Sequence, residues 1–200
     1  MIKRILIADD HKIVRDGLRN LLETQSDMKL IAEAEDGPMT IELTQQLKPD
    51  VVIMDISMPG FNGIEATNRI VNTVPDVKII AYSMYSERRF VVGMLKSGAL
   101  GYLLKDCAFD DLSKAIRAVC KDQIYLSTKI GEFIAQDFLN HLHEQEINDH
   151  TLLEKQQGNV LQLLAQGKSA DQITSELPID IKEYERCYHD IVNKWMLICS

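Results

Sequence analysis

The sequence predicts an α/β domain built on a doubly wound parallel sheet, followed by a smaller all-α unit. In residues 1–125, five short apolar segments alternate with segments whose apolar residues recur at helical spacing. The apolar segments are continuous, so both faces of each strand are expected to be buried beneath helices, as in a parallel sheet. From residue 126 onward, apolar residues keep the helical spacing. These observations predict two domains of different class.

The predicted strands and helices of the first domain alternate without exception. The strands are residues 5–8, 30–34, 51–54, 77–82 and 101–104. The helices are residues 12–24, 40–47, 63–72, 87–96 and 109–121. This order predicts a (βα)₅ unit over residues 1–125. In such a sheet, ligands bind beyond the carboxyl ends of the strands, where the strand order reverses.

The rest of the chain is predicted to be helical. Residues 126–150 are interpreted as a helical linker, with a helix over 128–143 that a polar run ends. Residues 151–200 are interpreted as the second domain, with three helical patterns separated by breaks at 167–169 and 178–180. Ser169 and Asp180 stand in these breaks at the positions of N-cap residues.

Composition predicts a soluble, cytoplasmic chain. Hydrophobic residues make up 46% and charged residues 26% of its 200 residues. It has no apolar run of about 18 residues, the length needed to span a bilayer, and its start lacks the features of a signal peptide. The net charge of −8 is uneven, because residues 126–200 carry 6 Lys and Arg against 12 Asp and Glu. The second part of the chain is therefore the acidic one.

Polar side chains follow four of the predicted strands. Asp9 and Asp10 close the first strand, Asp55 closes the third, Ser83 follows the fourth and Lys105 follows the fifth. Converging carboxylates repel one another, so this cluster is expected to bind a cation, and Mg²⁺ suits a set of acids. Lys105 and Ser83 would contact a phosphoryl group beside the ion, which a carboxylate would accept as an acyl phosphate.

Four ordered stretches carry a family resemblance. They read IADDH at 7–11, VVIMDISMPGFNGIEA at 51–66, IIAYSMYSE at 79–87 and GALGYLLKD at 98–106. Together they resemble the receiver domain of NarL/FixJ-type response regulators over about 125 residues. The resemblance implies a flavodoxin-like fold and control by phosphorylation.

The resemblance also implies a role for each residue of the cluster. Asp55 would be the phosphoacceptor and Lys105 the phosphoryl-binding lysine. Asp10 would be a direct Mg²⁺ ligand, Asp9 a direct or water-mediated ligand, and the backbone carbonyl of Ser57 a further one. Each of these residue types stands at the position that the family motif requires.

Signal output is expected to start from a switch pair. Ser83 and Tyr102 resemble the hydroxyl that turns toward the phosphoryl group and the aromatic ring that follows it inward. Their movement would repack the helix over 87–97, and the phosphate adds the charge that drives this change. Arg88 and Arg89 begin that helix. They would be solvated, pair across a homodimer or dock the second domain.

The phosphoryl donor has to come from outside the chain. The sequence has no nucleotide-binding loop of the G-x-x-x-x-G-K type, so a sensor histidine kinase or a small acyl phosphate is the expected donor. The chain is not predicted to be an enzyme with an external substrate. It would catalyse only its own phosphoryl transfer and dephosphorylation.

Residues 159–177 resemble the first two helices of a LuxR-type helix-turn-helix. In that family a further helix lies in the major groove of DNA. The corresponding stretch here is IKEYERCYHDIVNKW at 181–195, which keeps Lys182. Four positions where the family usually has Thr, Val, His and Arg carry other residues, namely Glu183, Tyr184, Cys187 and Tyr188. The family's last helix is expected to be absent, because the sequence stops at Ser200.

Two outputs remain open for the second domain. In the first, it controls transcription by binding DNA through Lys168, Lys182 and Arg186. In the second, it binds a protein partner, with Tyr184, Tyr188 and Trp195 as anchors, although Trp195 also suits a core position. Residues 151–200 hold five Lys and Arg against seven Asp and Glu, a charge that opposes binding to phosphates.

Overall fold

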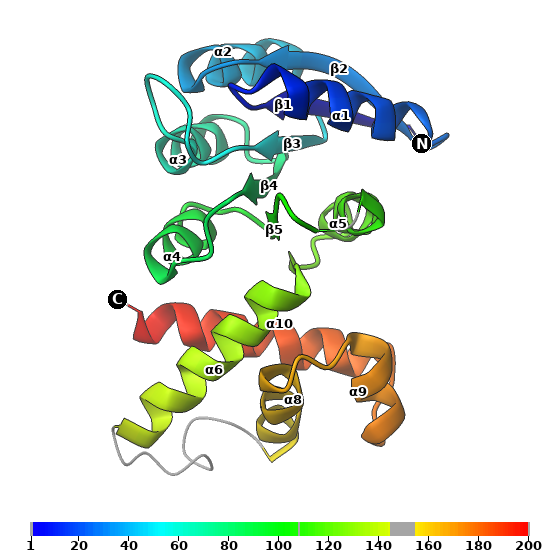
Figure 1. Ribbon diagram of the computed structural model, residues 1–200, viewed down its shortest axis with the longest axis vertical. Coiled ribbons are helices and arrows are strands. Elements are labelled where there is room, and N and C mark those ends of the chain that lie inside the picture. Colours follow the sequence, from blue (N-terminus) through cyan, green and yellow to red (C-terminus); the bar gives the residue numbers. More distant parts are fainter. Residues whose placement is uncertain (1, 108, 145–154, 200) are drawn as a thin grey trace. The chain divides into compact units, whose positions relative to one another are not determined.

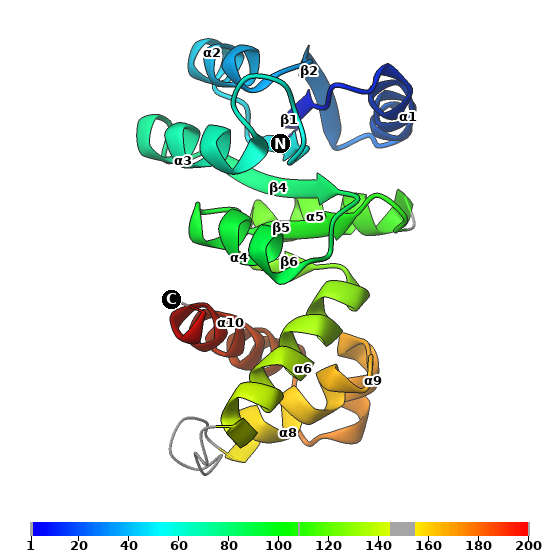
Figure 2. The ribbon, with the colours of Figure 1, turned by 60° about the vertical axis from the view of Figure 1, so that its left-hand side comes forward.

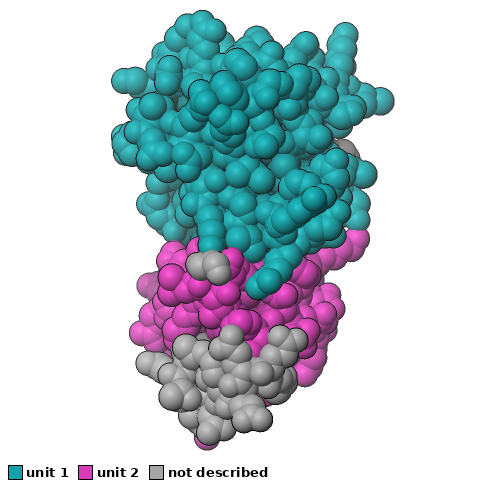
Figure 3. Space-filling view, turned by 90° about the vertical axis from the view of Figure 1, so that its left-hand side faces the viewer, with its two compact units in different colours: residues 1–125 teal, residues 126–200 magenta. Residues whose placement is uncertain are grey.

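A computed structural model of the chain describes residues 2–107, 109–144 and 155–199. It divides into two compact units, unit 1 (Met1–Tyr125) and unit 2 (Leu126–Ser200), which Figure 3 colours separately. Unit 1 is an α/β unit and unit 2 contains helices, so the predicted fold class is confirmed. No helix within the described ranges has the length and apolar character of a membrane span.

The sheet of unit 1 has the strand order β2-β1-β3-β4-β5-β6. Its first five strands pair in parallel. The strands are β1 (Lys3–Ala8), β2 (Met28–Ala34), β3 (Val51–Met54), β4 (Lys78–Ser83), β5 (Gly101–Leu104) and β6 (Tyr125–Leu126). The chain turns from β2 and β1 toward β3 and the remaining strands, so the order reverses beside β1. A ligand site is expected at that point of a doubly wound sheet.

Helices cover both faces of this sheet, as Figure 1 shows. One face carries α1 (Lys12–Glu23) and α5 (Phe109–Val119). The other carries α2 (Gly37–Leu47), α3 (Gly63–Thr73) and α4 (Arg88–Lys96). The residues of β3 and β5 are therefore all buried, as the continuous apolar runs predicted.

The largest differences between unit 1 and the sequence prediction concern α2 and β6. Helix α2 begins at Gly37 rather than residue 40, because the Asp36 side chain caps it by accepting a hydrogen bond from the Met39 N–H. The two-residue strand β6 was not predicted. Its Tyr125 N–H donates to the Leu100 carbonyl at 2.9 Å, which places β6 at the edge of the sheet beside β5.

Unit 2 contains α6 (Thr128–Glu144), α8 (Lys155–Ala165), α9 (Ala170–Glu176) and α10 (Ile181–Ile198). Figure 2 shows these helices gathered into one group. The predicted N-caps are confirmed. The Ser169 side chain accepts from the Gln172 N–H in a capping box, and Asp180 accepts from the Glu183 N–H.

Helix α6 belongs to the core of unit 2, where the sequence suggested a linker. It contacts α8 and α10. Trp195 of α10 is fully buried, donates a 2.7 Å hydrogen bond to Asp137 Oδ2 and meets the Phe133 ring edge to face at 6.4 Å. Helix α6 therefore packs on two helices of its own unit. The rest of the predicted linker, residues 145–150, lies outside the described residues.

Candidate functional site

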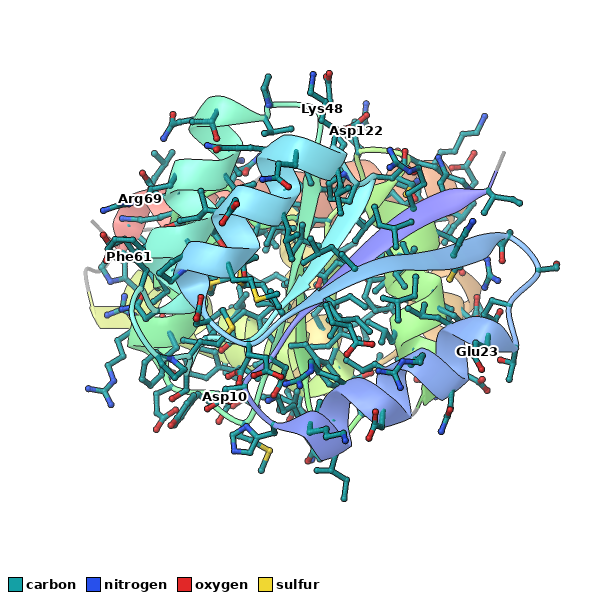
Figure 4. The ribbon with its side chains drawn as sticks, turned by 90° about the horizontal axis from the view of Figure 1, so that it is seen from above. Asp10, Glu23, Lys48, Phe61, Arg69 and Asp122 are labelled. Carbon is teal, nitrogen blue, oxygen red and sulfur yellow. The ribbon has the colours of Figure 1, made fainter. Side chains whose placement is uncertain are left out.

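The candidate site lies at the carboxyl edge of the parallel sheet. Figure 4 shows Asp10 at this edge, while Lys48 and Asp122 lie at the opposite edge. Backbone hydrogen bonds extend the sheet past its strand ends, since Asp9 N donates to Ala34 O at 3.1 Å and Asp55 N to Ala8 O at 2.8 Å. The parallel register therefore brings the acidic residues that follow β1 and β3 side by side.

Lys105 contacts the acidic residues that follow two strands, Asp9 after β1 and Asp55 after β3. Its Nζ lies 2.6 Å from Asp9 Oδ2 and 2.9 Å from Asp55 Oδ2. All three side chains are buried, with exposed fractions of 8%, 1% and 4%. One buried ammonium compensates only one of these two negative charges, and Asp10 adds a third acid at the same edge.

Burial and charge shift the pKa values of the two central groups in the same direction. Burial raises the pKa of Asp55 above its ordinary value, and the ion pair with Lys105 does not cancel this effect. Burial alone would lower the pKa of Lys105, but the hydrogen bonds and charges of Asp9 and Asp55 outweigh it and raise that pKa. Lys105 therefore stays protonated, while a further cation would favour the ionised form of Asp55.

The acidic cluster fits a hard divalent cation. Ligand atoms of Asp9, Asp10, His11 and Asp55 all lie within 4.8 Å of one another. Asp9 Oδ2 is buried, and its partner among the described residues is the Lys105 ammonium. Carboxylate oxygens at this separation suit Mg²⁺, which takes a few acidic ligands and keeps several waters. The residues present can therefore hold the predicted ion.

The turn after β3 fixes the Asp55 side chain. Asp55 Oδ1 accepts hydrogen bonds from the backbone N–H groups of Ile56 at 2.7 Å and Ser57 at 3.4 Å. This orients the carboxylate and leaves Oδ2 to Lys105. Gly63 makes the close turn possible, because a Cβ there would stand 2.1 Å from the Asp55 carbonyl oxygen. The role of the Ser57 carbonyl as a metal ligand stays a prediction.

The same turn is attached to the helix that follows it. The Arg69 guanidinium of α3 lies 3.8 Å from the centre of the Phe61 ring, and Figure 4 shows the two side chains next to each other. Gly60 has a φ of +78°, which a side-chain-bearing residue adopts only with strain. Both features shape the part of the loop that leads into α3.

Ser83 and Tyr102 meet at the loop between β4 and α4. The Ser83 hydroxyl accepts a hydrogen bond from the Tyr85 N–H at 3.1 Å. The Tyr102 hydroxyl donates to the Tyr85 carbonyl at 2.7 Å, and the Tyr102 side chain is fully buried. Both members of the predicted switch pair therefore contact the backbone of one loop residue, Tyr85, which the sequence analysis did not single out.

The predicted DNA contacts of unit 2 are partly engaged with acids of the same unit. Lys168 Nζ lies 2.6 Å from Glu176 Oε1, and Arg186 lies 3.7 Å from Glu183 Oε1. Lys182 is exposed in the first turn of α10. Binding a phosphate through Lys168 or Arg186 would therefore replace an existing ion pair.

Two of the three aromatic anchors suggested for a protein partner are core residues, which corrects that interpretation. Trp195 has no exposed surface and Tyr184 has 8%. Burial also raises the pKa of Tyr184 above its ordinary value. Tyr188 is half-buried and stacks on Tyr184 with ring centres 5.7 Å apart. An aromatic residue can serve as an anchor only where its face reaches a partner, so Trp195 and Tyr184 do not qualify.

Two residues next to the acidic cluster were not predicted as site residues from the sequence. His11 Nδ1 lies 2.6 Å from Asp10 Oδ1, and the imidazole is largely exposed. Arg15 donates a 2.7 Å hydrogen bond from Nη1 to the Asp9 carbonyl and is buried. A signal for Arg15 was available, because it shares the buried stripe of α1 with Leu18 and Leu22.

Comparisons with known proteins agree with this geometry. Residues 5–117 match the family model described as the response regulator receiver domain. The chain is 34% identical over 195 residues to the oxygen regulatory protein NreC of Staphylococcus haemolyticus, which covers 96% of this chain and 90% of that protein. Both units of the chain therefore fall within the aligned length.

Solved structures show the same likeness. A two-component response regulator of the LuxR family from Aurantimonas sp. SI85-9A1 shares 33% identity with a TM-score of 0.67, over 70% of this chain and 99% of that chain. The RcsB response regulator of Salmonella typhimurium shares 27% identity with a TM-score of 0.62, over 97% and 92%. On these matches, the chain belongs to the two-component response regulators and its first unit is a receiver domain.

Proposed function

We propose that this response regulator is switched by phosphorylation of Asp55 and passes the signal to transcription through unit 2. The observation that carries the proposal is the position of Lys105 Nζ, which lies 2.9 Å from Asp55 Oδ2 and 2.6 Å from Asp9 Oδ2. An ammonium at this point can stabilise negative charge on a phosphoryl group transferred to Asp55. The phosphoryl donor would be a sensor histidine kinase, and the location cytoplasmic.

The transfer is a displacement at phosphorus. A carboxylate oxygen of Asp55 forms a P–O bond while the P–N bond of a donor phosphohistidine breaks, and the released imidazole takes up a proton. Lys105 stays protonated and compensates charge throughout. Asp9, Asp10 and Asp55 would hold Mg²⁺, which supplies charge neutralisation at the phosphoryl oxygens. The hydrogen bonds from Ile56 and Ser57 keep the accepting carboxylate in one orientation.

The phosphoryl group would act on the loop between β4 and α4. Its oxygens are strong acceptors and would draw the Ser83 hydroxyl, which now accepts from the Tyr85 N–H. The Tyr102 hydroxyl is hydrogen-bonded to the carbonyl of the same residue, Tyr85. A shift of this loop would therefore change the contacts of both Ser83 and Tyr102. Arg89 in the first turn of α4 follows this loop and would report the shift at the surface.

Phosphorylation can be tested by mass spectrometry. We expect the chain to gain one phosphoryl group with Mg²⁺ and a small acyl phosphate, and Asp55→Asn to gain none. Lys105→Ala should slow the reaction by about 10²-fold or more, as for the loss of a charge-stabilising donor. Asp76→Asn, an exposed acid before β4, is the matched control and should react as the wild type. Labelling of Asp55→Asn would refute the assignment.

DNA is the first candidate target of unit 2. Its support is the match along nearly the whole chain to response regulators, including an RcsB structure described in terms of DNA interaction. A protein partner is the second candidate. The ion pairs of Lys168 and Arg186 and the acidic balance of residues 126–200 favour this alternative.

Binding of the full chain to mixed-sequence DNA separates the two candidates. If unit 2 binds DNA, phosphorylated protein should shift DNA at low salt, and the affinity should fall as salt rises. Lys182→Ala should weaken the complex. It should also reduce the slope of log affinity against log salt concentration by about one, the value for one phosphate contact. An absence of any shift at low salt, with phosphorylation intact, would favour the protein partner.

A further inference from the structure

Arg15 is a charged side chain in an apolar position. It lies on the face of α1 that packs on the sheet, together with Leu18 and Leu22, and only 5% of it is exposed. Removing an ion from water is unfavourable, and an apolar residue of similar size often stabilises a core as well as a buried ion pair does. A contribution to stability therefore does not by itself explain why an arginine occupies this buried position.

The guanidinium of Arg15 connects three segments of unit 1. Its Nη1 donates to the Asp9 carbonyl at 2.7 Å, its Nε to Glu33 Oε2 at 3.3 Å and its Nη2 to Glu35 Oε1. Glu33 belongs to β2 and Glu35 follows it. The planar, permanently charged fork of arginine can serve three acceptors in fixed directions, which a lysine ammonium cannot reproduce in the same geometry.

The carbonyl that Arg15 binds belongs to the peptide unit between Asp9 and Asp10. The N–H of Asp9 is held as well, by the Ala34 carbonyl at 3.1 Å. The backbone of the acidic pair is therefore fixed on both sides of Asp9. The directions of the two carboxylates depend on this backbone, and Arg15 is hydrogen-bonded to the peptide that lies between them.

Arg19 offers an internal comparison. It binds the same Glu33, with Nε 2.9 Å and Nη2 2.5 Å from Oε1, and it also pairs with Asp16 at 2.9 Å. None of the hydrogen bonds and ion pairs described for Arg19 involves Asp9. Arg15 and Arg19 thus share one acidic partner, but the described hydrogen bonds connect only Arg15 to the peptide between the acidic residues.

We propose that Arg15 is a positioning residue for the divalent cation. By holding the Asp9 carbonyl, it keeps the Asp9 and Asp10 carboxylates in the arrangement that the ion requires before the ion binds. Outer partners of this kind fix metal ligands, and their removal weakens metal affinity about 10- to 100-fold. The inference rests on the proposed Mg²⁺ site and adds to it a residue that does not touch the ion.

The test is calorimetric titration of the unphosphorylated full chain with Mg²⁺. We expect Arg15→Met to raise the dissociation constant about tenfold or more. Arg15→Lys should also weaken binding several-fold, although it keeps the charge. Arg19→Met, the matched control, should bind within about twofold of the wild type, because Asp9 keeps its contact. Thermal unfolding of each variant shows whether it is folded.

Each outcome bears on a separate claim. If Arg15→Met folds and binds Mg²⁺ with the affinity of the wild type, the positioning role is overturned. If Arg15→Met does not fold, wild-type Mg²⁺ affinity of Arg15→Lys overturns it instead. Equal weakening in Arg15→Met and Arg19→Met would also overturn it, since the effect would then come from the shared Glu33. A wild-type chain that binds no Mg²⁺ would instead overturn the proposed metal site.

Discussion

The indole N–H of Trp195 donates a 2.7 Å hydrogen bond to Asp137 Oδ2 and thereby ties α10 to α6. Asp137→Ala would leave this buried donor without its acceptor, at a cost of about 1–3 kcal/mol in the free energy of unfolding of unit 2. Trp195 is the single tryptophan of the chain, so its fluorescence during urea unfolding reports on this unit.

The control for this prediction is Asn140→Ala, an exposed position on the same helix. It should change the free energy of unfolding by less than about 0.5 kcal/mol. An equally small effect of Asp137→Ala would show that α6 does not stabilise α10 through this contact.

Gly63 and Gly17 should respond in opposite ways to the same substitution. Gly63→Ala forces a Cβ to within 2.1 Å of the Asp55 carbonyl, so the loop has to move. We expect a loss of more than about 2 kcal/mol in stability, together with slower phosphorylation of Asp55. Gly17→Ala meets nothing within 4 Å inside helix α1 and should stabilise unit 1 by about 0.5–1 kcal/mol.

Circular dichroism during urea unfolding measures both glycine variants. Equal effects of the two substitutions would mean that helix propensity alone decides the outcome. The close packing of the turn on Asp55 would then not matter.

Mg²⁺ should stabilise unit 1, because it relieves the repulsion among Asp9, Asp10 and Asp55. A ligand present at about 100 times its dissociation constant adds about 2.7 kcal/mol to the free energy of unfolding. The melting temperature should therefore rise with Mg²⁺ and fall again with a chelator. Asp10→Asn should remove most of the response, whereas Asp76→Asn should keep it. A full response in Asp10→Asn would contradict the ligand assignment.

Alkaline pH should destabilise unit 1 through Tyr82. Burial raises the pKa of Tyr82 to about 12, whereas the phenol ionises at about 10 in the unfolded chain. Between these two values the unfolded chain binds fewer protons than the folded one, so the free energy of unfolding falls as pH rises. Urea unfolding at about pH 9 and about pH 11 measures the loss. Tyr82→Phe should lose less stability, and an unchanged loss would exclude Tyr82 as a contributor.

Much of unit 1 was predictable from the sequence, because burial on both faces leaves continuous apolar runs such as Val51–Met54. The site geometry followed as well, since residues at the carboxyl ends of neighbouring parallel strands have to lie close together. Strand β6 was not predictable, because two residues carry no periodicity. The start of α2 depended on the Asp36 cap, which no apolar pattern indicates.

Unit 2 was harder to predict because periodicity shows which face of a helix is apolar but not what covers it. The apolar spacing over 128–143 predicted helix α6 correctly. The packing of α6 on Trp195 could be seen only in the folded structure. Arg15 was missed for a related reason. A charge on an apolar stripe shows that something unusual is buried, but only the structure identifies the Asp9 carbonyl as its partner.

The short strand β6 also bears on how copies of this chain can associate. An open sheet can recruit a foreign strand at either edge, and proteins suppress this with very short or charged edge strands. Here one edge is β6, two residues long, and the other is β2, where Lys29 is exposed and Glu33 is held by Arg15 and Arg19. Neither edge offers a long, uncharged template, so the architecture of unit 1 disfavours aggregation by strand addition.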